Sequence, residues 1–230
     1  MAETFALTDL LARSALFASL PSEERTALAE RMSEVELDPG QLLFGRGDPG
    51  TDIYLVVEGR IRLSVLSVEG RELSFAHATT GDLFGEIAAL DDAPRSADAT
   101  AITQARLKML PQSELQRLLL THPAVALAAI KLLCSRLRDL SEHVEAIALH
   151  PVEIRLARLL LDMLEERAPT IGSPSLPLDV TQGELGLLIG TTRQRANAAL
   201  MALERAGAIL RSEGQLTCNL RELQRIALRG

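Results

Sequence analysis

The strongest constraint on the fold is a change of pattern at Pro111, where short apolar runs give way to long helical periodicity. Between Val35 and Leu110 the runs are short, and Gly, Pro and Asp interrupt them at regular intervals. The runs with strand character are Ile53–Val57, Ile61–Val65, Leu73–Phe75 and Ala105–Leu110. Turn signals at this spacing predict an antiparallel sandwich, roll or barrel.

Helices are predicted on both sides of this region. Residues 7–33 indicate two helices, and the stretch from Ser22 to Arg25 has the N-cap chemistry that starts the second. After Pro111 the pattern is helical to about residue 167, with an interruption at Pro151. Within it, apolar residues recur at alternating spacings of three and four, the a/d pattern of a coiled coil. This seam consists of Ile130, Leu133, Leu137, Leu140, Val144 and Ile147. Because polar residues flank it, a narrow homodimer seam is favoured over packing on the chain's own β-region.

The C-terminal third has a different organisation. Residues Ala168–Pro177 are rich in Pro, Gly and Ser and predict a loop. Two short helices follow, Thr181–Leu188 and Thr192–Ala206, and then short β-type runs at Ala208–Leu210 and Gln215–Cys218. Helix, tight turn, helix and hairpin form the order of a winged helix-turn-helix.

Charge and composition narrow the class of protein. Residues 1–150 carry 14 basic and 22 acidic side chains, whereas residues 151–230 carry ten arginines and nine acidic side chains. The acidic excess therefore lies in the N-terminal part, and the nearly neutral C-terminal third remains able to bind DNA. Aromatic residues make up 3%, which argues against stacking platforms for single-stranded nucleic acid. Two cysteines and no Cys/His cluster argue against a structural metal and for a reducing compartment. With neither a signal peptide nor a membrane span expected, we place the protein in the cytoplasm.

The first candidate site is the segment Gly81–Leu90 followed by Pro94-Arg95-Ser96-Ala97. A glycine before a short helical turn exposes backbone N–H groups to an anion, and Arg95 adds a bidentate phosphate donor. Glu86 is an acceptor suited to a ribose hydroxyl. The pair therefore fits a nucleotide with a phosphate, a sugar hydroxyl and a base, although an ion pair that only closes a turn stays possible.

The same segment resembles the phosphate-binding cassette of cyclic-nucleotide-binding domains, and the whole chain resembles the cyclic-AMP receptor protein (CRP/FNR) family of bacterial transcription regulators. The resemblance implies that Glu86 takes the ribose 2′-hydroxyl and that Arg95 and Ser96 take the cyclic phosphate. It also implies that Arg136 and Ser141 contact the ligand, Ser141 from the opposite subunit. The implied ligand site consists of Phe84, Gly85, Glu86, Ile87, Arg95, Ser96, Arg136, Leu140 and Ser141.

Leu140 departs from the family pattern, in which a Thr hydrogen-bonds the purine amino group. Leucine can neither donate nor accept, so both cyclic AMP and cyclic GMP remain candidate allosteric effectors. A regulator of the same architecture that needs no cyclic nucleotide, or that senses cyclic di-GMP or a haem-bound gas, is the alternative.

The second candidate site is the helix pair. Thr192 is a natural N-cap, which places Arg193, Gln194 and Asn197 at the exposed start of the second helix, where residues reach base edges in a major groove. Arginine pairs with guanine, and Gln and Asn suit adenine. Thr181, Thr192 and Arg195 are better placed for phosphate. A winged-helix module that binds protein, or a merely solvated polar face, is the alternative.

These patterns predict an α+β fold that binds and regulates rather than catalyses. No catalytic constellation is present, and the scattered His77, His122, His143 and His150 do not indicate a metal site; His77 remains open as a haem ligand. The expected organisation is a β-roll sensor (1–120), a dimerisation helix (121–150) and a winged helix-turn-helix (151–230). The resemblance implies double-stranded DNA, a second copy of the chain and RNA polymerase as partners.

Overall fold

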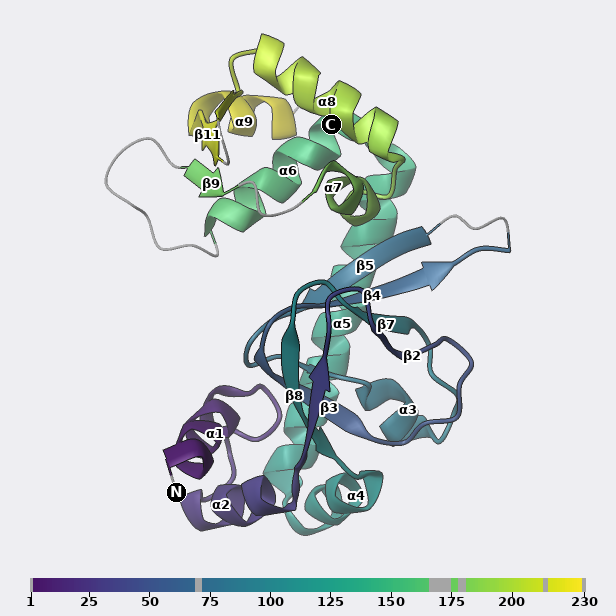
Figure 1. Cartoon of the computed structure of the whole chain (residues 1–230), viewed down its shortest axis with the longest axis vertical. Helices are drawn as coiled ribbons and strands as arrows, with labels where there is room; N and C mark the ends of the chain where they lie inside the picture. Colours follow the sequence, from purple (N-terminus) through teal and green to yellow (C-terminus); the bar gives the residue numbers. More distant parts are fainter. Residues whose placement is uncertain (1, 69–71, 166–174, 178–180, 213–214, 229–230) are drawn as a thin grey trace. The chain divides into compact units, whose positions relative to one another are not determined.

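The computed structural model describes residues 2–68, 72–165, 175–177, 181–212 and 215–228. Internal contacts divide the chain into two compact units, Met1–Arg71 with Ala76–Arg138, and Glu72–Phe75 with Asp139–Gly230. The division falls within the long helix α5 (Pro123–Leu149). Each unit is described by itself below, with the element labels of Figure 1.

The N-terminal unit is built on antiparallel strands in two four-stranded sheets, with orders β1-β8-β3-β6 and β2-β7-β4-β5, except that Glu72–Phe75 of the edge strand β5 group with the C-terminal unit. The strands are β1 (Ser33–Leu37), β2 (Leu42–Phe44), β3 (Ile53–Glu58), β4 (Ile61–Leu66), β5 (Glu72–Ala78), β6 (Leu83–Phe84), β7 (Asp98–Ala101) and β8 (Ala105–Leu110). The predicted strands correspond to β3, β4, β5 and β8. Sequence reasoning missed β1, β2, β6 and β7, which span five residues or fewer and give little periodic signal.

Helices cover the first of these sheets. They are α1 (Ala2–Arg13), α2 (Ser22–Arg31), α4 (Gln112–Thr121) and the first half of α5. Their inward side chains, including Leu11, Leu28 and Leu118, share one core with Ile53 and Leu55 of β3. Burying this apolar surface against the sheet fixes the helices in place.

The N-cap predicted between Ser22 and Arg25 is wrong. The cap position of α2 is Pro21, whose ψ of 152° is extended, and no side chain makes a capping hydrogen bond there. Ser22 is already helical, so its hydroxyl lies one position too late to act as the cap. Its carbonyl instead accepts a hydrogen bond from Thr26 at 3.0 Å.

The predicted seam lies along α5. Most of its residues are exposed in the single chain, and Ile147 is half-buried. The exposed members are Ile130, Leu133, Leu137, Leu140 and Val144. Pro151 follows the helix, as predicted, and separates it from α6 (Val152–Glu165).

The C-terminal unit packs α6, α7 (Gln182–Leu188), α8 (Arg193–Arg205) and α9 (Leu220–Ala227) around one core with a three-stranded sheet. The antiparallel sheet has the order β10-β11-β9, with β9 at Ser175–Pro177, β10 at Ile209–Ser212 and β11 at Gln215–Cys218. The predicted helix pair and hairpin are confirmed. The two helices begin and end within one residue of the predicted limits.

Two elements of this unit were not predicted. Up to position 174, the expected loop Ala168–Pro177 lies outside the described residues. Its last three residues form β9, in which Leu176 pairs with Leu216 and is buried. Helix α9 was missed, although Asn219 caps it by accepting from the N–H of Glu222 at 3.3 Å, and Leu223 and Ile226 are buried. Asn followed by apolar residues at helical spacing was the available signal.

Within the described residues, no single helix has the length and apolarity to cross a membrane. The bent pair of α4 and α5 passes by length and composition, with an angle of 115° between its parts.

Candidate functional site

The turn that carries the first candidate site joins a buried strand to a short helix. Phe84 ends β6, which pairs with β3 at Tyr54 and Leu55. Gly85 follows with φ +83° and precedes α3 (Glu86–Asp91). A Cβ at Gly85 would lie 2.9 Å from Nη1 of Arg95. Glycine is therefore required here both for the left-handed backbone and for the close approach of the arginine.

Arg95 is only 4% exposed, although it is a cation. Its Nη1 donates to the carbonyl oxygens of Asp52 at 2.9 Å and Gly85 at 3.1 Å. Its guanidinium carbon lies 4.3 Å from the ring centroid of Phe44 and 5.7 Å from that of Tyr54. Its Nε is buried without a hydrogen-bond partner. Within the described part of the chain Arg95 forms no ion pair, so neutral groups hold a desolvated positive charge.

Glu86, which is 5% exposed, is paired with a different arginine. Its Oε1 lies 3.7 Å from Nε of Arg136 on α5, and Nη2 of Arg136 donates to the carbonyl of Leu83 at 2.7 Å. The ion pair of Glu86 with Arg95 that sequence reasoning left open is not formed among the described residues. Glu86, Arg95 and Arg136 nevertheless meet at the same turn. Arg95 contacts Gly85, and Arg136 contacts Leu83 and Glu86.

The other predicted ligand residues are distributed over both units. Ile87 and Ser96 are exposed beside the buried Glu86 and Arg95. Leu140 and Ser141 are exposed on the part of α5 that belongs to the C-terminal unit. The structure thus gathers the cassette residues and Arg136 within one unit and places Leu140 and Ser141 in the other.

Sequence reasoning missed the aromatic residues beside Arg95. The chain has five Phe, one Tyr and no Trp, and three of these six rings gather here. The ring centroids lie 5.8 Å apart for Phe44 and Tyr54, 6.1 Å for Phe44 and Phe84, and 5.4 Å for Tyr54 and Phe84. We call Phe44, Tyr54 and Phe84 the aromatic cluster. Burial raises the pKa of Tyr54, and the positive charge of Arg95 opposes that shift.

The second candidate site has the expected helix geometry. Thr181 caps α7 by accepting from the N–H of Glu184 at 3.2 Å, and Thr192 caps α8 by accepting from the N–H of Arg195 at 3.3 Å. The predicted N-cap at Thr192 is confirmed. A Cβ at Gly186 would lie 3.0 Å from the carbonyl oxygen of Thr191, so the two helices meet closely at the turn.

The start of α8 presents polar side chains to solvent. Arg193, Gln194 and Arg195 are exposed, Asn197 is half-buried, and Thr181 is exposed at the start of α7. The opposite face of α8 is buried in the core through Ala196, Ala199, Leu200 and Leu203. Core packing therefore fixes the orientation of α8 and leaves its polar first turn free for a partner.

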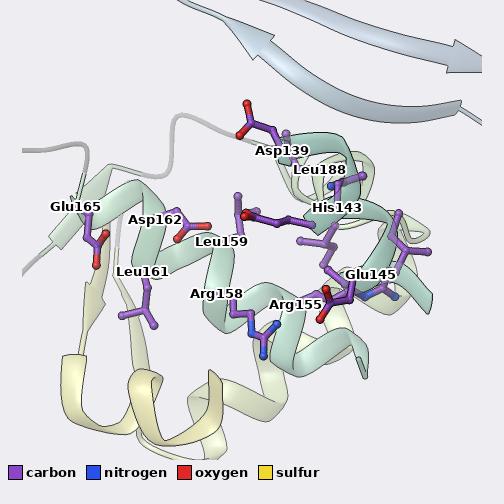
Figure 2. Close-up of a pocket in the computed structure, with 14 residues that line it drawn as sticks. Asp139, His143, Glu145, Arg155, Arg158, Leu159, Leu161, Asp162, Glu165 and Leu188 are labelled. Atoms are coloured by element: carbon purple, nitrogen blue, oxygen red, sulfur yellow. The ribbon is translucent and has the colours of Figure 1, made fainter. Parts of the chain in front are cut away.

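A cavity of about 530 Å³ lies next to the turn of the helix pair, lined by charged and apolar residues of α5, α6 and α7 (Figure 2). Glu145 and His143 come from α5, and Arg155 comes from α6. Burial, and then the charge of Arg155, lowers the pKa of His143. Burial likewise lowers the pKa of Arg155, and the charge of Arg195 adds to that effect. The charge of Arg195, on α8, thus acts on an arginine that lines this cavity.

Elsewhere in the N-terminal unit, His77 of β5 is half-buried, and burial, with the charges of Arg60 and Arg62, lowers its pKa to about 4. In the described part of the chain, no group of three or more His, Cys, Asp or Glu side chains could hold a metal ion.

Comparison with known proteins covers both sites. Residues 34–122 match the family model of the cyclic nucleotide-binding domain, and residues 154–226 match that of the Crp-like helix-turn-helix domain. The Cyclic AMP receptor protein of Thermus thermophilus is 31% identical over 210 residues, 91% of this chain and 93% of that protein. The CRP-like cAMP-activated global transcriptional regulator of Mycobacterium tuberculosis is 27% identical over the same shares. FixK2 from Bradyrhizobium japonicum has a similar fold, with a TM-score of 0.75 at 22% identity over 86% of this chain and 98% of that one.

Proposed function

Because the chain belongs to the CRP/FNR family of transcription regulators, we propose that it binds promoter DNA as a homodimer and that a cyclic nucleotide controls this binding. The similar proteins are transcription regulators rather than enzymes. The observation that carries the proposal is Arg95, a buried cation held by neutral groups, with one N–H that lacks a partner. A buried unpaired charge is costly unless an anion completes it.

In the proposed complex, Arg95 and Ser96 bind the cyclic phosphate. Glu86 accepts a hydrogen bond from the ribose hydroxyl, and Arg136 already lies beside its buried carboxylate. Phe84, Gly85 and Ile87 form the wall of the site. These groups recognise parts shared by cyclic AMP and cyclic GMP.

The purine base is left to α5. Arg136 approaches the cassette from this helix, and Ser141 is proposed to reach the ligand from the partner subunit. Leu140 offers no hydrogen bond to a purine amino group, so we expect little preference for adenine over guanine.

The seam on α5 supports the homodimer. Exposed apolar residues in a line of this length are unfavourable in water unless another surface covers them. A second copy of the chain, related by a two-fold axis, can cover the seam with the same residues. The same symmetry places two copies of α8 to match DNA half-sites one helical turn apart.

DNA is read by the start of α8. Arg193 is placed for guanine, Gln194 and Asn197 for adenine, and Arg195, Thr181 and Thr192 for phosphate. We propose RNA polymerase as the further partner and the cytoplasm as the compartment, where both unpaired cysteines, Cys134 and Cys218, stay reduced.

Control follows from a shift between two packings of the long helices. A ligand moves this equilibrium only through its different affinity for the two states, so ligand and DNA must strengthen each other's binding equally. Equal ligand affinity with and without operator DNA would exclude this control.

Calorimetric titration of the full chain with cyclic AMP, cyclic GMP and cyclic di-GMP tests the effector. We expect a cyclic mononucleotide to bind, and R95A to bind it at least tenfold more weakly, since a charge-assisted hydrogen bond contributes about 1.5–3 kcal/mol. The control is R46A, which removes an exposed arginine of the same unit. Absence of cyclic mononucleotide binding by the wild-type protein at millimolar concentration, or binding of cyclic di-GMP alone, would refute the assignment.

A further inference from the structure

The aromatic cluster gives Arg95 an unusual environment. The guanidinium of an arginine is planar, and it stacks on an aromatic ring when the two planes approach closely. In this chain the guanidinium carbon lies 4.3 Å from the centroid of Phe44, within the range of a strong cation–π contact. Phe44 itself packs against Tyr54 and Phe84, so two further rings hold the ring that touches the cation.

Two hydrogen bonds of the Arg95 guanidinium come from one nitrogen, Nη1. Nη1 donates to the carbonyl oxygens of Asp52 and Gly85. Nε, on the opposite edge, is buried without a hydrogen-bond partner. A Cβ at Gly50 would lie 2.4 Å from Nε and 2.9 Å from Nη2, so the glycine leaves this edge free of a side chain. The edge formed by Nε and Nη2 is one of the edges with which an arginine binds a phosphate through two parallel hydrogen bonds.

We propose that Phe44 is a positioning residue for the effector's phosphate. Its ring fixes the plane of the Arg95 guanidinium, the two carbonyl groups fix its rotation in that plane, and the Nε edge is thereby oriented for an anion. Phe44 acts through Arg95 and makes no contact with the ligand. This inference rests on the proposed cyclic-nucleotide function.

The geometry also accounts for how a buried cation is tolerated before the anion arrives. The ring face supplies electrostatic stabilisation that a desolvated cation lacks, without the carboxylate that would compete with phosphate. An arginine held in one rotamer loses little conformational freedom when the phosphate binds, which raises affinity.

Calorimetric titration of the full chain with cyclic AMP and with cyclic GMP tests the role. We expect F44L to bind both nucleotides about tenfold more weakly, because the leucine side chain has no π face. The ratio of the two affinities should not change, since both nucleotides carry the same phosphate. F44Y keeps the ring and should bind within about twofold of the wild type.

A double-mutant cycle separates positioning from a general loss of packing. In an R95K background the planar fork is gone, so F44L should lower affinity by less than about twofold further. The packing control is F17L, which removes a fully buried ring from the helical core of the same unit. It should lower the unfolding temperature and leave both affinities unchanged.

The outcomes are distinct. If the wild-type protein binds a cyclic mononucleotide and F44L binds it equally well, the positioning role is wrong and the proposed function stands. A loss in the R95K background as large as that in the wild type also overturns the role, because the ring would then act independently of the guanidinium. If the wild-type protein binds neither nucleotide, the proposed function fails, and the inference fails with it.

Discussion

Replacing Gly190 with alanine tests how tightly the turn of the helix pair is held against α5. Gly190 lies between α7 and α8 with φ +62°. A Cβ built on it would lie 2.6 Å from Cδ1 and 2.8 Å from Cγ1 of Ile147, closer than side-chain carbons normally approach. Arg155 also reaches this residue, with Nη1 at 3.5 Å from its carbonyl oxygen.

Two costs add in G190A. A left-handed backbone costs an alanine roughly 1–2 kcal/mol. Displacing Ile147 from a packed position costs roughly 1–3 kcal/mol more, as in other overpacked sites. The free energy of unfolding should therefore fall by about 2–5 kcal/mol, which lowers Tm by about 4–20 °C in a chain of this size.

Gly207 provides the matched control. It follows α8 with φ +70°, but a Cβ there would meet no heavy atom within 4 Å. G207A therefore carries only the backbone cost, about 1–2 kcal/mol, and a Tm decrease of about 2–8 °C. Scanning calorimetry of the full chain gives both values. The difference between the two variants measures the contact with Ile147.

The I147A background isolates that contact further, because it removes the two atoms that the new Cβ would overlap and leaves only Nη1 of Arg155 at 3.4 Å, an ordinary contact. In that background G190A should cost no more than G207A does. Equal decreases of Tm for G190A and G207A in the wild-type background would show that Ile147 yields freely and would refute this reasoning. We also expect G190A to bind operator DNA more weakly, since the displaced turn leads directly into α8.

Four further predictions concern pH, assembly and specificity. Burial lowers the pKa of His77 in the folded chain to about 4. As pH falls from 6.5 to about 4, His77 is therefore protonated in the unfolded chain but still neutral in the folded one. The free energy of unfolding should fall by up to about 3 kcal/mol over this range. H77Q should lose this dependence in denaturant titrations, and an unchanged slope would contradict the assignment. L137D should be monomeric in light scattering and lose DNA affinity; a stable dimer would disprove the seam. Selection from random DNA should show R193A relaxing one guanine position in each half-site, whereas R195A weakens all sequences and lowers the salt slope by about 1. L140T should increase the preference for cyclic AMP over cyclic GMP, and an unchanged ratio would count against the assigned contact.

Local sequence patterns were enough to predict the elements whose signal lies within a few residues. Strand β3 is a continuous apolar run, β4 and β8 alternate apolar with polar residues, and Thr192 stands directly before a helical pattern. These elements are stabilised by interactions between residues close in sequence or by burial of one apolar face. The spacing of residue types along the chain is therefore enough to predict them.

Elements that depend on pairing could not be read in the same way. Leu176 belongs to a strand only because Leu216 lies opposite it, and Pro21 takes the cap position that the serine after it was expected to hold. Neither outcome follows from the local residues alone, because a strand is stabilised by its neighbour and a cap by the backbone angle that the chain adopts there.

The candidate site shows the same division. Glu86, Arg95 and Arg193 could be proposed as site residues from the sequence alone, because each stands in a recognisable local pattern. Their partners depend on the fold: Glu86 pairs with Arg136, and Arg95 stacks on Phe44, fifty-one positions earlier in the chain. A side chain's identity is local, but desolvation and a ring face come from residues that folding brings together.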